Sequence, residues 1–223
     1  MSNSHWLLNA RLLPNEHRLP GFDRLLESWL NVHKKFCSSV YPEHSWEWDY
    51  KERSQVGFLS NAAALIGGIA LQEWGTTKKS GYGRNDLWLR LRPPTDNEDY
   101  FVEAKQETID LHVPLVDSMQ VISLVMNRAI EDAQRLNPQT GKAAAISFFT
   151  LRFAAEKIDS LDQICLDLLD QIEKQNQGFI TWDAMGAVWF RSEDFRVCRE
   201  RRKEQYLNWK NNEVGIVLLA KVV

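Results

Sequence analysis

Three charged residues on two neighbouring segments are the part of this chain best suited to chemistry. Asp86 begins the segment NDLWLRLR, and Glu103 and Lys105 lie two positions apart in the segment DYFVEAKQE. Side chains two positions apart in a strand point to the same face. If the two segments form a hairpin, Asp86 and Glu103 meet near one end of a sheet, with Lys105 beside them. Two carboxylates in that position make an oxygen-rich site suited to Mg²⁺.

A lysine next to a two-carboxylate metal site points to phosphodiester hydrolysis. The metal and the lysine can hold a phosphate oxygen and promote formation of hydroxide from a bound water. The spacing alone carries little information, because a second acid–x–lysine unit, Asp49-Tyr50-Lys51, occurs elsewhere. The context of Glu103 and Lys105 is more informative, since charges within the apolar run FVEAK are costly to bury unless paired or functional. The alternative interpretation is a structural ion pair at a sheet edge.

Apolar periodicity predicts the elements that must position these residues. Residues 22–36 are predicted as an amphipathic helix within an N-terminal helical extension, residues 1–48, that packs on the main domain. A long helix is predicted over residues 49–74. Gly67 and Gly68 inside it lower helix propensity, which indicates close approach of another backbone.

The remaining chain alternates between strand and helix patterns. The segments holding Asp86 and Glu103 are predicted as a hairpin, because apolar residues alternate along the first and the turn RPPTDNED contains two prolines. A helix over residues 113–136, an apolar strand over 142–153, a helix from 161 and two late strands follow. This order predicts that residues 49–223 form one α/β domain, a mixed central sheet flanked by helices.

The string GRNDLWLRL, a turn and YFVEAKQ, preceded by an acid-bearing helix, resembles the PD-(D/E)xK nuclease superfamily with its restriction-endonuclease-like fold. The core of that family is a helix, a three-stranded meander, a helix and a further strand. The match covers roughly Trp48 to Phe153. It departs from the family in order, because the helix at 113–136 precedes the third predicted strand, and Asn85 stands where the family has proline.

The resemblance implies roles for individual residues. Asp86 and Glu103 would be ligands of Mg²⁺, with Mn²⁺ as a substitute, and Lys105 would be the catalytic lysine. Gln106 is similar to the polar residue that often follows that lysine, and it is a candidate for nucleic-acid binding.

A glutamate on the preceding helix is also implied by the resemblance. Glu52 lies in the first half of the predicted helix, as in the family, and is the favoured candidate for catalysis and metal binding. Glu73 lies closer to Asp86 along the chain and is its competitor.

Two basic features are candidates for contacts with a nucleic-acid backbone. Arg84 lies in a glycine-containing loop beside Asp86, and the segment RVCRERRKEQYLNWK contains Arg199, Arg202 and Lys203 interleaved with aromatic residues. The alternative for the segment is a solvated helix face with internal ion pairs.

Composition limits the other function classes. The 27 basic and 30 acidic residues give a net charge of −3, which argues against coating of nucleic acid through bulk positive charge. The three cysteines form no CxxC pair and the five histidines show no metal-ligand spacing. The N-terminal apolar run is too short for a signal peptide, and the apolar stretch at 56–71 is shorter than a membrane span, so a cytoplasmic protein is expected.

The sequence thus predicts a Mg²⁺-dependent nuclease, with DNA as the favoured substrate and a homodimer as a state common among such folds. The alternative is a catalytically inactive module of the same fold that binds nucleic acid or a protein, for example in a defence or toxin–immunity system.

Overall fold

The computed structural model describes residues 8–15, 17–39, 51–78, 81–91, 98–138, 140–153, 159–176, 178, 181–196 and 213–223. The strands and helices in chain order are β1 (Leu8–Leu13), α1 (Phe22–Ser39), α2 (Glu52–Leu65), β2 (Ile69–Lys78), β3 (Gly81–Leu91), β4 (Glu98–Asp110), α3 (Leu115–Ala133), β5 (Lys142–Arg152), α4 (Leu161–Gln175), β6 (Ala184–Phe190) and β7 (Glu213–Val222).

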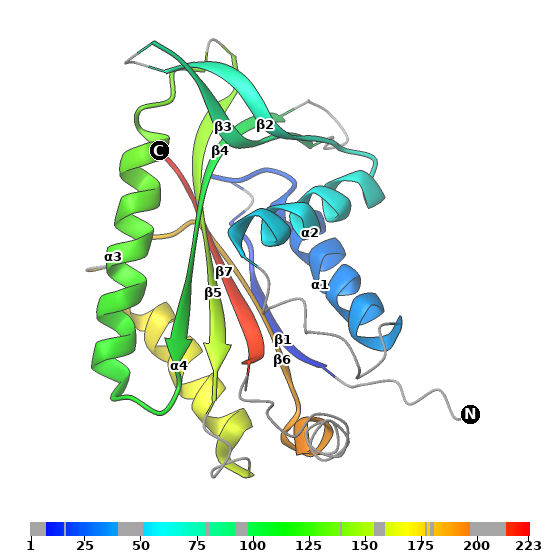
Figure 1. Cartoon of the computed structure of the whole chain (residues 1–223), viewed down its shortest axis with the longest axis vertical. Coiled ribbons are helices and arrows are strands. Elements are labelled where there is room, and N and C mark those ends of the chain that lie inside the picture. The colour runs from blue at the N-terminus through cyan, green and yellow to red at the C-terminus, as the bar shows by residue number, and fades with distance from the viewer. Residues whose placement is uncertain are drawn as a thin grey trace.

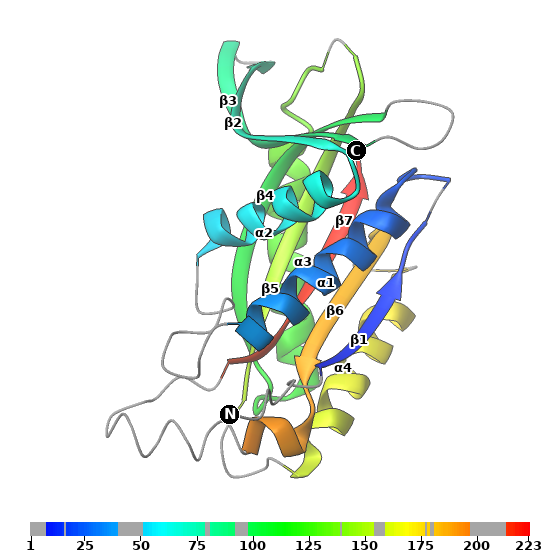
Figure 2. The same cartoon turned by 90° about the vertical axis from the view of Figure 1, so that its right-hand side faces the viewer.

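The strands form one open mixed sheet of seven strands in the order β1-β6-β7-β5-β4-β3-β2. The β4–β5 pair is parallel, and the other neighbours are antiparallel. Helices α1 and α2 lie on one face of the sheet, and α3 and α4 lie on the other (Figures 1 and 2). The structure is therefore an α/β protein with helices on both faces, as the sequence predicted.

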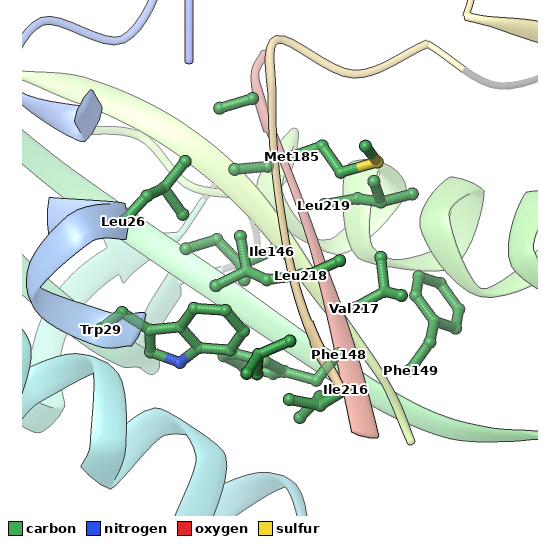
Figure 3. Packing of buried hydrophobic residues seen from close by; sticks show 14 of the residues in the cluster. Leu26, Trp29, Ile146, Phe148, Phe149, Met185, Ile216, Val217, Leu218 and Leu219 are labelled. Atoms are coloured by element: carbon green, nitrogen blue, oxygen red, sulfur yellow. The ribbon is translucent and has the colours of Figure 1, made fainter. Parts of the chain in front are cut away.

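The core is centred on β5, the middle strand of the seven. All residues of β5 between its two ends are buried, which agrees with the prediction of an apolar central strand. Figure 3 shows Leu26 and Trp29 of α1 on the same side of the sheet as Phe148, whereas Phe149 and Val217 point to the opposite side. Because both faces bury apolar side chains, the sheet is rigid and can hold functional side chains in fixed positions.

The helix predicted over residues 49–74 is the main error of the sequence analysis. Helix α2 ends at Leu65, because Gly67 adopts a φ of +79°, which continues no right-handed helix. The N–H groups of Gly67 and Gly68 donate to the carbonyls of Ala64 and Ala63, a Schellman ending. A Cβ on Gly68 would lie 2.8 Å from the carbonyl oxygen of Arg90, so the predicted close backbone approach is confirmed at this residue.

Residues 69–78 form the strand β2 instead of the second half of that helix. Strands β2, β3 and β4 make an antiparallel meander, and α3 then leads to β5, which is parallel to β4. The predicted sequence order, with only two strands before the long helix, is therefore wrong. The observed order is helix, three-stranded meander, helix and parallel strand.

The N-terminal region also differs from its prediction as a helical extension. Strand β1 pairs with β6 and forms one edge of the main sheet, so this region contributes a strand as well as α1. The amphipathic character of α1 is confirmed, with Phe22, Leu25, Leu26 and Trp29 fully buried. The predicted boundary at residue 48 lies outside the described residues.

The hairpin of β3 and β4 and the helices α3 and α4 are confirmed, as are the two late strands β6 and β7. Within the part of the chain that the structure describes, no helix is both long and apolar enough to cross a membrane.

Candidate functional site

The site forms where β3 separates from β4. The β3–β4 ladder runs from Leu91 opposite Glu98 to Leu87 opposite Val102, whereas β4 continues beside β5 as far as Asp110 (Figure 1). In the same register, the next two residues to face each other are Asp86 and Glu103. The hairpin therefore brings this acid pair to the point of separation.

The side chain of Asp86 hydrogen-bonds the backbone of β4 just beyond the last residue pair of the β3–β4 ladder. Its Oδ2 atom accepts the backbone N–H of Ala104 at 2.7 Å. The side chain thus lies along the edge of β4 that β3 has left. This bond fixes the Asp86 carboxylate beside Glu103, which is buried with only 5% of its surface exposed.

Glu52 reaches the same edge of β4 from helix α2. It is the first residue of α2, and its carboxylate accepts a hydrogen bond from the backbone N–H of Gln106. The N–H groups of Ala104 and Gln106 are two positions apart and point to the same edge of the strand. Asp86, from a strand, and Glu52, from a helix, therefore bind two neighbouring N–H groups along the same edge of β4.

The pKa of Glu52 is shifted by burial and by the charged groups around it. Burial raises this pKa most, and the negative charge of Asp86 raises it further. Lys105 and the Gln106 N–H lower it, and Glu103 raises it by a smaller amount. The net direction is upward. Three carboxylates and one lysine thus act on one another within a single cluster, which we call the acid cluster: Glu52, Asp86, Glu103 and Lys105.

Lys105 is held by a residue of α3. Its Nζ lies 2.9 Å from Oδ2 of Asp132, whose Oδ1 atom accepts a hydrogen bond from Arg135 at 2.9 Å. Burial acts to lower the pKa of Lys105 and is the largest influence, but Asp132, Glu52 and Asp86 together outweigh it and raise this pKa. Lys105 is therefore an ammonium ion at neutral pH.

The carboxylates of the acid cluster are chemically suited to Mg²⁺. Mg²⁺ takes hard oxygen ligands, and one or two protein carboxylates with water and substrate phosphate are its usual set. In the described ranges, no group of three or more His, Cys, Asp and Glu side chains is arranged to hold a metal ion. A Mg²⁺ site here would thus use one or two of Asp86, Glu103 and Glu52, with water and substrate oxygens completing it.

Glu73, the competitor of Glu52, lies on a strand and not on the helix. It is in β2, between the register pairs Gln72–Leu87 and Trp74–Asn85. Its carboxylate contacts Arg53 at 3.1 Å and Arg84 at 3.5 Å. The carboxylate that enters the acid cluster from α2 is that of Glu52.

The remaining predicted residues occupy different positions. The Gln106 side chain donates to Oγ1 of Thr150 at 3.0 Å, on the opposite face of β4 from Lys105, so Gln106 reaches the site through its backbone. Arg84 lies on β3, not in a loop. Arg199, Arg202 and Lys203 lie outside the described residues.

Sequence reasoning missed Asp132 and Arg53. Asp132 lies on the predicted α3, but its contact with Lys105 depends on how that helix packs against β4. Arg53 follows Glu52 directly and had no local signal that would pair it with Glu73.

Comparisons with protein-family models, curated proteins and solved structures find no match for this chain. The function is therefore argued from the site itself.

Proposed function

We propose that the protein is a metal-dependent nuclease that hydrolyses phosphodiester bonds, with DNA as the favoured substrate. The observation that carries the proposal is the meeting of Glu52, Asp86, Glu103 and Lys105 at the separation of β3 from β4. These groups come from three elements, and a carboxylate-rich cluster with one lysine beside it fits metal-assisted phosphodiester hydrolysis.

The order of elements gives independent support. Helix α2, the meander β2–β3–β4, helix α3 and strand β5 follow one another in the order of the restriction-endonuclease-like core. Asp86 is on the second meander strand, Glu103 and Lys105 are on the third, and Glu52 begins the preceding helix. We therefore infer a restriction-endonuclease-like fold.

Each residue of the acid cluster has a distinct task in this proposal. Asp86 and Glu103 would hold Mg²⁺, which would supply positive charge at the scissile phosphate and lower the pKa of water. Lys105, kept as an ammonium ion, donates hydrogen bonds to a phosphate oxygen and offsets the charge that develops there. Glu52 holds the attacking water through its carboxylate, and its raised pKa suits it to accept a proton.

A binding module without catalysis is the second candidate. The contacts of Lys105 with Asp132 and of Asp86 with the Ala104 N–H form a connected polar network within the protein alone. Such a network can be purely structural, and the net charge of −3 favours a protein partner over nucleic acid.

Cleavage assays separate the two candidates. Supercoiled plasmid, linear duplex and single-stranded DNA are incubated with Mg²⁺ or Mn²⁺ and the wild-type protein, the Lys105→Ala variant or a Lys174→Ala control. Lys174 is an exposed lysine on α4, away from the acid cluster. The nuclease proposal expects metal-dependent cutting that survives Lys174→Ala and is lost in Lys105→Ala. Equal cutting by both variants, or none by the wild type on any substrate, contradicts it.

A further inference from the structure

We propose that Arg53 and Arg84, braced on Glu73, bind phosphates of a single nucleic-acid strand beside the acid cluster, with Trp74 stacking on one of its bases. This inference rests on the proposed function, because it takes nucleic acid as the ligand. It goes further by naming single-stranded nucleic acid as the form that the site receives.

The two arginines converge from different elements. Arg53 is in the first turn of α2, directly after Glu52, and Arg84 is on β3, two residues before Asp86. Their guanidinium groups contact opposite oxygens of Glu73, at 3.1 and 3.5 Å. Both arginines are thus tied to the border of the acid cluster by their sequence neighbours.

These contacts leave most of each guanidinium available to a ligand. The side chains of Arg53 and Arg84 are 79% and 72% exposed. A guanidinium carries five N–H donors, and each contact with Glu73 involves one nitrogen. Exposed ion pairs of this kind contribute little to stability. What Glu73 does provide is orientation of two long side chains, which lowers the entropy lost when a phosphate binds.

The backbone of Glu73 supports a functional role for this arrangement. Its φ of +52° is in the left-handed region, and among the described residues it is the one non-glycine with a positive φ. A strained conformation of this kind costs free energy, and such conformations cluster at active sites and ligand clamps. Here it places the carboxylate between the two arginines.

The exposed Trp74 of β2 lies next to Trp88 of β3 at this border. Residues opposite each other in neighbouring strands project to one face, and the pairs Leu71–Trp88 and Trp88–Phe101 extend the Glu103 face across β3 and β2. Trp74 follows Glu73 and is 46% exposed, with its ring centroid 6.0 Å from that of Trp88. One aromatic ring is therefore supported by another and remains open to a ligand.

The chemistry of this border fits a single strand. Arginines attract backbone phosphates, and an exposed aromatic ring stacks on an unpaired base, whereas the bases of a duplex are already stacked on one another. Two arginines and one glutamate give this border a charge of +1, next to an acid cluster that repels phosphates. A strand held here would place its next phosphate beside Asp86 and Glu103, where the proposed Mg²⁺ would offset this repulsion.

Binding can be measured separately from cleavage. In the Lys105→Ala background without divalent metal, fluorescence anisotropy of labelled single-stranded and duplex 20-mers gives affinities over a range of salt concentrations. The variants are Arg53→Gln with Arg84→Gln, Trp74→Ala, and Arg11→Gln as the control. Arg11 is on β1 at the opposite edge of the sheet and also contacts two acids, Asp170 and Glu173. Thermal unfolding of each variant checks that it is folded.

The double arginine variant should bind single-stranded DNA about 10-fold more weakly or worse, and its salt slope should fall by roughly 1.4, the value for two lost phosphate contacts. Trp74→Ala should weaken single-strand binding by roughly 5- to 150-fold, and Arg11→Gln should leave it unchanged. Unchanged binding by the arginine variants overturns the inference, as does tighter binding of duplex than of single strand. Either result would leave the nuclease proposal standing, because the cleavage assay tests it separately. Conversely, arginine-dependent binding without any cleavage would contradict only the nuclease proposal.

Discussion

The Nζ atom of Lys105 and the Oδ2 atom of Asp132 lie 2.9 Å apart, so the position of the lysine on β4 is set by a residue of α3. Asp132 is itself fixed by Arg135, three residues further along the chain and just past the end of α3. The lysine of the proposed active site is thus oriented by the packing of a helix on the sheet.

Replacing Asp132 with Asn should lower catalysis without unfolding the protein. The amide keeps a hydrogen-bond acceptor for Lys105 but removes the charge that holds the ammonium in place. Loss of such an orienting partner typically costs about 10- to 100-fold in activity. We expect the loss in kcat with KM little changed, measured by steady-state cleavage of DNA. Glu131→Gln, at the adjacent exposed position of α3, is the control, and a loss of the same size in that variant would contradict a specific role for Asp132.

Glu52→Gln should stabilise the protein at neutral pH while it reduces cleavage. The pKa of Glu52 is raised in the folded state, so the folded protein binds a proton more tightly than the unfolded chain. The stabilisation from this group is complete below its unfolded pKa and is lost as pH rises through the folded pKa. A neutral amide removes that loss and still accepts the Gln106 N–H. The melting temperature at pH 7 to 8 should rise by roughly 1–3 °C.

The pH range over which this gain appears is itself a test. At a pH below the ordinary carboxyl range, wild-type Glu52 is protonated and the two proteins should melt at the same temperature. A gain in melting temperature that is equal at low and neutral pH would show that the charge of Glu52 is not its cause.

Asp86→Asn should weaken metal binding and keep the fold. The amide oxygen can still accept the Ala104 N–H, which Asp86 accepts at 2.7 Å. One of the carboxylates proposed to hold Mg²⁺ is lost, so the affinity for Mn²⁺ should fall by about 10-fold or more. Isothermal titration calorimetry measures this without DNA. Asp167→Asn on α4 provides an acid-to-amide control away from the site, and equal affinity in the two variants would rule out Asp86 as a ligand.

Gly68→Ala should destabilise the whole domain. The added Cβ would lie 2.8 Å from the carbonyl oxygen of Arg90 and 3.0 Å from that of Ala63, so the ending of α2 or strand β3 must move. Overpacking of this kind costs about 1–3 kcal/mol. Urea denaturation followed by circular dichroism measures the free energy of unfolding. Gly178→Ala, where the nearest atom is 3.8 Å from the added Cβ, is the control and should be nearly neutral.

The fold was predictable from the sequence where the signal was local. Helices α1, α3 and α4 carry their own apolar periodicity and strand β5 is a nearly continuous apolar run, and all four were found. Strand β1 was missed because it is short and its partner β6 is distant along the chain. Strand β2 was assigned to a helix because its short, mostly apolar run, IALQEW, has no period that separates a strand from a helix. The stop signal at Gly67 was interpreted as a packing feature instead.

The candidate site was likewise predictable only where the sequence signal was local. Asp86 and Glu103 follow from the register of one hairpin, and the structure brings them together. Glu52 was favoured over Glu73, but the sequence could not settle the choice, since it depends on where α2 ends and how it lies against the sheet. Asp132 required the packing of α3 on β4, which no local pattern reveals.

The hydrogen bonds of Asp86 and Glu52 to β4 also affect the behaviour of the protein at high concentration. A strand edge with open N–H groups is a template for pairing with another chain, and proteins often protect such edges with charge. Here the N–H groups of Ala104 and Gln106 are already bound by carboxylates. An incoming strand would have to displace two charged acceptors, so the same acids that form the candidate site protect this edge against aggregation.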